Sequence, residues 1–179
     1  MNRCFIALDV EKRVKELGNK VILDLKSNGF YAKWVEEENF HITLFFLGEI
    51  TDEEIEKTAS IVKMIDKAPF RVLIDRVGFF QKKGKPTSIW LGIKKNPALE
   101  VIYDSLRAAL ERTYKKPFRE KFIPHLTLGR IKRAPADWNG KLKNMTVQTV
   151  ETGDIVFSLN RSTLTETGPI YETLAKKAI

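Results

Sequence analysis

The chain has two histidines, and each opens a tetrapeptide with threonine two residues on and leucine three residues on: His41-Ile42-Thr43-Leu44 and His125-Leu126-Thr127-Leu128. In a strand, alternate side chains share a face, so each histidine and its threonine point the same way, roughly 6.5 to 7 Å apart. One neutral and one protonated imidazole on opposite sides of a phosphorus atom can act as base and acid in an in-line displacement. The pattern therefore indicates phosphoester chemistry in which the threonine hydroxyls hold phosphate oxygens.

Two alternative interpretations concern these same residues. Zinc binding is disfavoured, because structural zinc sites take four protein ligands and catalytic sites take three, while the chain has one cysteine and no HExxH motif. We therefore expect neither a metal nor another cofactor. Thr43 and Thr127 also suit a purely strand-forming role, and that alternative stays open.

Composition favours a polyanionic partner. The 179 residues include 31 Lys and Arg against 23 Asp and Glu, a formal net charge of +8, which suits nucleic acid. Cationic residues cluster around the second histidine motif: Arg112, Lys115, Lys116, Arg119, Lys121, Arg130, Lys132 and Arg133. A second patch contains Lys82, Lys83 and Lys85. We expect RNA as the partner and a monomeric protein, although a merely solvated basic surface remains an alternative for either patch alone.

The single cysteine, Cys4, excludes an intramolecular disulfide and lies in a short apolar run that we expect to be a buried strand. No apolar stretch approaches the roughly 20 residues that span a bilayer. These features predict a soluble, cytoplasmic protein without membrane contact.

Hydrophobic periodicity predicts a strand at residues 4–8, a helix from Val14 to Leu25 that ends at Asn28-Gly29, and a strand at residues 40–47. Shifting the register by 84 residues, the separation of the two histidines, places residues 89–93 over 5–9 and a second helical pattern over the first. Strand-forming residues 70–74 likewise fall over 154–158.

Other local signals complete the prediction. Thr51 reads as the N-cap of a helix with Glu54 completing a capping box, residues 81–86 as a flexible lysine-rich loop, and residues 133–143 as a connector. We expect an α+β fold: one domain, residues 1–179, of two similar antiparallel sheet lobes (roughly 1–83 and 85–167) with outer helices. A pseudo-two-fold would relate the lobes, with the active-site cleft between them.

At this point the chain resembles the 2H phosphoesterase superfamily, named for two HxTx motifs, and within it the RNA 2′,3′-cyclic phosphodiesterases, also called 2′-5′ RNA ligases. The resemblance spans nearly the whole chain. Besides the two motifs it includes residues 3–8, 46–49, 159–162 and 168–171, which read RCFIAL, FLGE, LNRS and GPIY.

The resemblance implies metal-independent hydrolysis of a terminal RNA 2′,3′-cyclic phosphate to a 2′-phosphomonoester. His41 would be the proton donor to the 3′ oxygen and His125 the proton acceptor that activates water, with Thr43 and Thr127 binding the phosphate. The same site, run in reverse, would be an ATP-independent 2′-5′ RNA ligase.

Arg130 resembles a family position that contacts the nucleotide or its phosphate, but strict alternation would turn it away from His125 and Thr127. A bulge at Gly129 would be needed to bring it round. Phe79, Phe80 and Trp90 suit base stacking, although core packing is the favoured interpretation.

Two other functions stay open from the sequence. One is a non-catalytic RNA-binding module, and the other is a 2H enzyme acting on a different substrate, such as a cyclic ADP-ribose phosphate or a 2′-5′ oligoadenylate.

Overall fold

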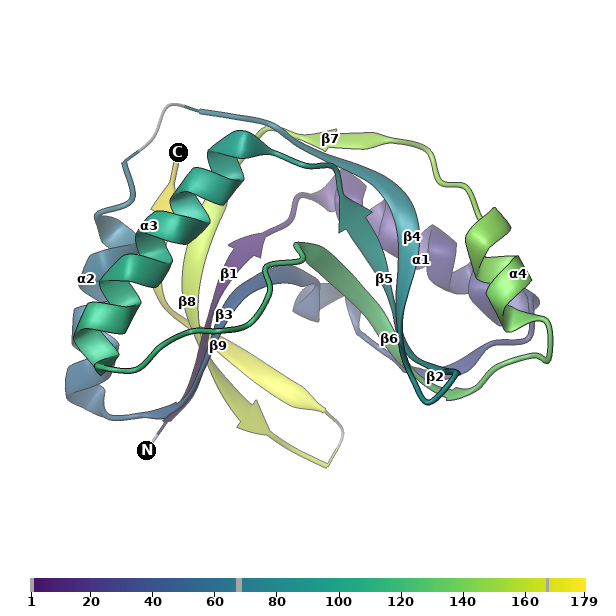
Figure 1. Cartoon of the computed structure of the whole chain (residues 1–179), viewed down its shortest axis with the longest axis horizontal. Coiled ribbons are helices and arrows are strands. Elements are labelled where there is room, and N and C mark those ends of the chain that lie inside the picture. Colours follow the sequence, from purple (N-terminus) through teal and green to yellow (C-terminus); the bar gives the residue numbers. More distant parts are fainter. Residues whose placement is uncertain (1, 67–68, 167) are drawn as a thin grey trace.

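The computed structural model describes residues 2–66, 69–166 and 168–179 (Figure 1). In chain order the elements are β1 (Asn2–Asp9), α1 (Lys12–Ser27), β2 (Tyr31–Trp34), the short helix η1 (Glu37–Asn39), β3 (His41–Ile50), α2 (Asp52–Lys63), β4 (Val72–Lys82), β5 (Lys85–Ile93), α3 (Pro97–Tyr114), β6 (His125–Arg133), α4 (Trp138–Asn144), β7 (Val150–Thr152), β8 (Val156–Leu164) and β9 (Pro169–Ala178). The α+β prediction is confirmed.

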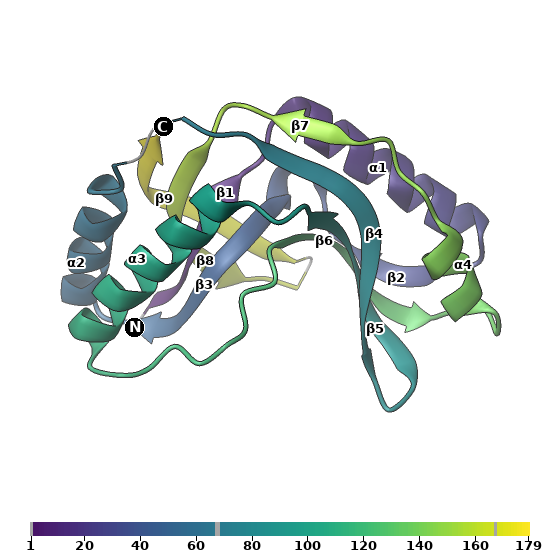
Figure 2. The ribbon, with the colours of Figure 1, turned by 45° about the horizontal axis from the view of Figure 1, so that its top comes forward.

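The strands form one curled antiparallel sheet in the order β7-β4-β5-β6-β3-β1-β8-β9, with β2 paired to the free stretch of β6. Its two halves meet where β3 pairs with β6 through a single residue pair, Ile42 with Leu126. We call this place the junction. The helices lie on the outside of the curl, with α2 and α3 side by side over one half and α1 and α4 over the other (Figures 1 and 2).

The 84-residue register matches the element order. β3 falls over β6, α1 over α3, α2 over α4, and β4 over β8. Each half of the sheet nevertheless mixes both halves of the sequence, because β4 pairs with β5 whereas β8 pairs with β1. The division at residues 83–85 therefore remains a proposal about the repeat, while the sheet itself is divided at the junction.

Local signals set the helix ends. Thr51 caps α2 by accepting from the backbone N–H of Glu54, and the Glu54 carboxylate accepts in return from the backbone N–H of Thr51, so the predicted capping box is confirmed. Helix α1 ends at Asn28, and Gly29 follows with a φ of 86°, which glycine adopts without steric cost. The first β-strand and helix are thus fixed close to where the sequence placed them.

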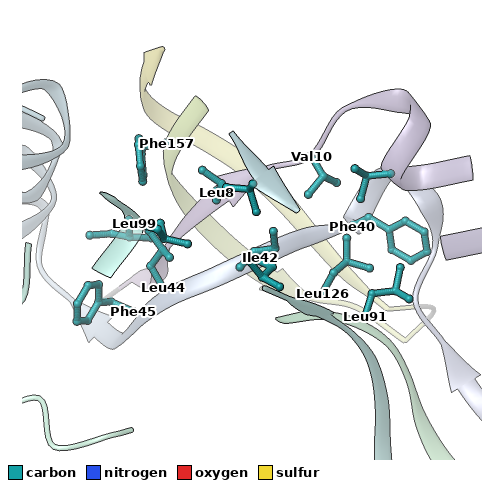
Figure 3. Packing of buried hydrophobic residues seen from close by; sticks show 14 of the residues in the cluster. Leu8, Val10, Phe40, Ile42, Leu44, Phe45, Leu91, Leu99, Leu126 and Phe157 are labelled. Carbon is teal, nitrogen blue, oxygen red and sulfur yellow. The ribbon is translucent and has the colours of Figure 1, made fainter. Parts of the chain in front are cut away.

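The core fills the space between the sheet and its outer helices (Figure 3). Cys4 is 1% exposed on β1, as predicted. Ile42 and Leu126 at the junction are fully buried, and each such side chain contributes roughly 1.5 to 3 kcal/mol by leaving water. Under α3, the Tyr103 ring stacks at 4.4 Å on Phe45 of β3. This apolar layer anchors the motif strands from below.

Two segments differ from the sequence prediction. The predicted loop at 81–86 is wrong: β4 and β5 continue to a two-residue turn whose central residues, Lys83 and Gly84, have φ of 51° and 73°. Two positive φ angles match the right-handed twist of a hairpin. The predicted connector at 133–143 contains most of α4, where Trp138 packs edge-on against Phe79 at 5.2 Å.

Candidate active site

The four motif side chains leave the sheet together at the junction. Ile42 and Leu126 pair and point into the core, so the residues beside them point to the opposite, concave face. The antiparallel register sets His41 across from Thr127 and Thr43 across from His125. The two histidines therefore occupy diagonal corners of one small site, with the threonines at the other two corners.

His41 is held in one tautomer. Its Nδ1 lies 2.7 Å from the carbonyl oxygen of Asn39, which can only accept, so Nδ1 carries the hydrogen. In the neutral ring Nε2 then accepts from the Thr43 hydroxyl at 3.0 Å. His41 thus presents Nε2 to the concave face beside the hydroxyl of its own motif.

His125 follows the same plan. Its Nδ1 donates to the carbonyl oxygen of Ile123 at 2.6 Å, and within the described residues its Nε2 has no hydrogen-bond partner. Burial lowers the pKa of both imidazoles, and the charge of His125 lowers that of His41 further, as expected of two rings close enough to repel when both are protonated. A pair of this kind favours one charged and one neutral ring.

Aromatic rings flank each histidine. The His41 ring lies 4.8 Å from Phe5 and 5.3 Å, edge-on, from Tyr171. The His125 ring lies 5.6 Å from Trp90 and 5.1 Å, edge-on, from Phe80. Trp90 is only 9% exposed, so it serves as a wall of the site, in keeping with core packing. These walls restrict both imidazole rings to one orientation.

One charge distinguishes the two histidines. Asp9 pairs across β1 and β3 with His41, and its carboxylate raises the pKa of that imidazole, although burial outweighs it. Ser158 and Lys176 both donate to Asp9, at 2.6 and 3.0 Å. No carboxylate is among the groups that shift the pKa of His125. His41 is therefore the better placed of the two to carry a proton.

Bulges after each threonine bring two further residues to the concave face. On β5, Trp90 pairs with Thr127 and Ile89 with Gly129, which leaves Leu128 as the extra residue of β6. Ser88, on the same face as Trp90, then pairs with Arg130. The bulge that Arg130 requires is present, and its side chain shares the face of Thr127.

The first motif repeats this feature. Ala7 pairs with Thr43 and Ile6 with Phe45, so Leu44 is the extra residue of β3. Phe46 is thereby turned outward and is 61% exposed. Phe46 and Arg130 are thus matching positions on the two motif strands, 84 residues apart.

A cleft of about 1030 Å³ lies over this face. His41, Thr43, Thr127 and Arg130 all line it, together with the β8–β9 hairpin and the segment from β2 to η1. The ring of Trp34 supports β6 from behind, where a Cβ at Gly129 would lie 2.7 Å from it. The cleft is large enough for a nucleotide-sized ligand.

Sequence reasoning missed Asp9, Phe5 and the role of the carbonyls at Asn39 and Ile123. Asp9 ends an apolar strand, and only its pairing with His41 reveals its relevance. The carbonyls had a usable signal, since each stands two residues before a motif histidine. Among the described residues no group of three or more His, Cys, Asp or Glu side chains is arranged to hold a metal ion, and no described helix is long and apolar enough to cross a membrane.

Comparison with known proteins gives consistent relatives. Residues 9–90 match the family model described as LigT like Phosphoesterase. The chain is 38% identical over 174 residues to the RNA 2′,3′-cyclic phosphodiesterase of Thermotoga maritima, covering 96% of this chain and 92% of that protein. It is 34% identical to the protein of the same name from Archaeoglobus fulgidus, covering 96% and 97%.

Solved structures show the same fold. The crystal structure of E. coli LigT complexed with 3′-AMP superposes with a TM-score of 0.79 at 22% identity, covering 99% of this chain and 97% of that one. A Thermus thermophilus protein superposes with a TM-score of 0.76 at 28% identity, covering 98% and 97%. The curled sheet and its four outer helices are therefore shared with these structures.

Proposed function

The chain belongs to the LigT-like phosphoesterase family of the 2H superfamily, and from that premise we propose that it hydrolyses terminal RNA 2′,3′-cyclic phosphates to 2′-phosphomonoesters. The motif-based prediction of the superfamily is thus confirmed. The observation that carries the proposed reaction is the diagonal placement of two Nδ1-anchored histidines, each offering Nε2 to one site. In-line displacement at phosphorus needs a base and an acid on opposite sides, and diagonal corners supply that arrangement.

In the proposed step, Nε2 of neutral His125 takes a proton from water as the water oxygen bonds to phosphorus. The bond from phosphorus to the 3′ oxygen breaks, and Nε2–H of protonated His41 donates its proton to that oxygen. The products are a 2′-phosphomonoester and a free 3′-hydroxyl. The Asp9 carboxylate supports His41 as the donor, because it stabilises the protonated ring.

The threonines would hold the phosphate. When His41 is protonated at Nε2 it no longer accepts from Thr43, so the Thr43 hydroxyl becomes free to donate to a non-bridging oxygen. Thr127 would act in the same way from the opposite strand, and Arg130 would add a cation at the cleft edge. No metal takes part in this scheme.

A 5′-hydroxyl in place of water would make the same site a 2′-5′ RNA ligase. Its oxygen would bond to phosphorus, the 3′ oxygen would leave with the proton of His41, and no ATP would be consumed. This reaction is a secondary part of the proposal.

The test is incubation of the purified protein, in EDTA, with an RNA oligonucleotide ending in a 2′,3′-cyclic phosphate. We expect a 2′-phosphate product, and we expect His41→Ala and His125→Ala each to lower the rate at least about 100-fold. A 3′-phosphate product would overturn the assignment of His41, and activity near wild type in either variant would remove the mechanism. RNA binding without product would instead favour the non-catalytic binding module.

A further inference from the structure

We propose that the RNA chain leading to the cyclic end lies along the concave face of β2 and β6, on a strip that starts at Arg130 and Lys33 and ends at Arg133 and Tyr31. We call these four residues the RNA track. The inference rests on the proposed function, since it concerns the nucleotides beyond the one that reacts.

The register places the track on one face. Lys33 pairs with Arg130, so both share the face of Thr127. A second irregularity follows, because Ala32 pairs with Ile131 whereas Tyr31 pairs with Arg133, which leaves Lys132 as an extra residue. Without that bulge, Arg133 would point to the face of the buried Ala32.

Contacts and exposure agree with this register. All four side chains of the track are exposed, and the Arg133 guanidinium lies 6.0 Å from the centroid of the Tyr31 ring. Ile131 and Trp34, by contrast, pack against the core on the other face. The track is therefore a solvent-facing strip that begins beside Thr127 and leads away from the junction.

The cations of the track are free to bind an anion. Within the described residues, the ion pairs of the molecule engage other cations and leave Lys33, Arg130 and Arg133 without a carboxylate. Glu36, Glu37 and Glu38 follow β2 at its junction end. Their charge would repel a phosphate backbone from that end and favour its passage outward along the track.

The chemistry of the strip fits single-stranded RNA. Proteins that bind single strands combine a cationic groove along the backbone with aromatic rings on which bases stack. Tyr31 is 61% exposed and supplies such a ring at the outer end. From Thr127 to Arg133 the strand covers roughly 15 to 20 Å, which is long enough for a short single-stranded segment.

The experiment compares substrates that differ only in length. We would measure kcat/KM for uridine 2′,3′-cyclic monophosphate and for a hexanucleotide with the same cyclic end, in wild type and in the double variant Tyr31→Ser, Arg133→Gln. In wild type the hexanucleotide should be the better substrate. In the double variant the ratio of hexanucleotide to mononucleotide kcat/KM should fall roughly 5-fold, as for loss of one exposed ion pair and one stacking ring.

The matched control is Arg112→Gln, which removes the same charge from the exposed end of α3, outside the track. Its substrate ratio should remain that of wild type. An equal fall in Arg112→Gln would show a general charge effect and overturn the track, as would an unchanged ratio in the double variant.

A binding measurement separates this inference from the proposed function. The affinity of a hexanucleotide carrying a 2′-phosphate is measured at several salt concentrations and requires no turnover. The double variant should bind more weakly, with a salt slope smaller by about 0.7 for the lost phosphate contact. A wild type that binds with the expected slope but turns over neither substrate would refute the proposed reaction alone. Equal affinity and slope in wild type and the double variant would refute the track alone.

Discussion

The carboxylate of Glu11 should account for a large part of the stability of the fold at neutral pH. Its Oε1 accepts from the backbone N–H groups of Asp154 and Gly153, at 2.8 and 2.6 Å, and from the Thr152 hydroxyl at 2.9 Å. These residues link β7 in one half of the sheet to β8 in the other. The hydrogen bond from Asp154 is the main cause that lowers the pKa of Glu11 from 4.5 to about 2, with a smaller contribution from Arg13.

The magnitude follows from that pKa. Each unit corresponds to about 1.4 kcal/mol, so ionised Glu11 contributes about 3 kcal/mol at neutral pH as an upper value. Its side chain is only 19% exposed, so water screens it little. Because the folded-state pKa is depressed, the contribution is complete above the unfolded value of about 4.5 and disappears as the pH falls toward 2.

The assay is urea unfolding of wild type and Glu11→Gln at pH 7, 4 and 2. Glutamine keeps an acceptor oxygen and removes the charge, so the variant should be less stable by about 2 to 3 kcal/mol at pH 7 and nearly equal to wild type at pH 2. Glu16→Gln, on the same helix with a 63% exposed side chain 3.8 Å from Lys12, is the control and should change stability by less than about 0.5 kcal/mol. A difference that stays constant with pH would refute the reasoning.

Three further predictions concern the site. Because burial lowers the pKa of both His41 and His125, the bell-shaped pH profile of kcat/KM should have its maximum below about pH 6.5, and a maximum above pH 7 would contradict this. Asp9→Asn removes the charge that raises the pKa of His41, so the alkaline limb of that profile should move to lower pH; an unmoved limb would exclude Asp9 as a modulator. Gly129→Ala places a methyl group 2.7 Å from Trp34 and should cost about 1 to 3 kcal/mol in urea unfolding, whereas Gly140→Ala, with open space around it, should not; equal effects would rule out this steric account.

Much of the architecture could be predicted because its signals are local. The motif strands alternate cleanly, the α1 stripe has helical spacing, and the capping box at Thr51 and Glu54 is a short-range pattern. The 84-residue register followed from two histidines. These features depend on residues within one turn or strand of each other, so their sequence neighbours specify them.

What the sequence could not provide depends on pairing between distant segments. Nothing in β4 or β8 states which strand each will join, so the exchange between the two halves was not predictable. Strand β2 is four residues long with two exposed side chains, and α4 contains Gly140 within seven residues, so both lack a clear periodic signal. The bulge that turns Arg130 was identified only as a requirement, because its position depends on the partner strand β5.

The exchange of strands also bears on synthesis of the protein by the ribosome. The first histidine motif lies on β3, but β1 beside it needs β8, which pairs in turn with β9, the last strand of the chain. A nascent chain that has released its first 140 residues already contains both motifs, yet the open edge of β1 has no partner. Loop closure over such a separation is slow compared with local contacts. The site therefore matures only after release of the C-terminal strands, so a truncated translation product would carry both histidine motifs without an assembled active site.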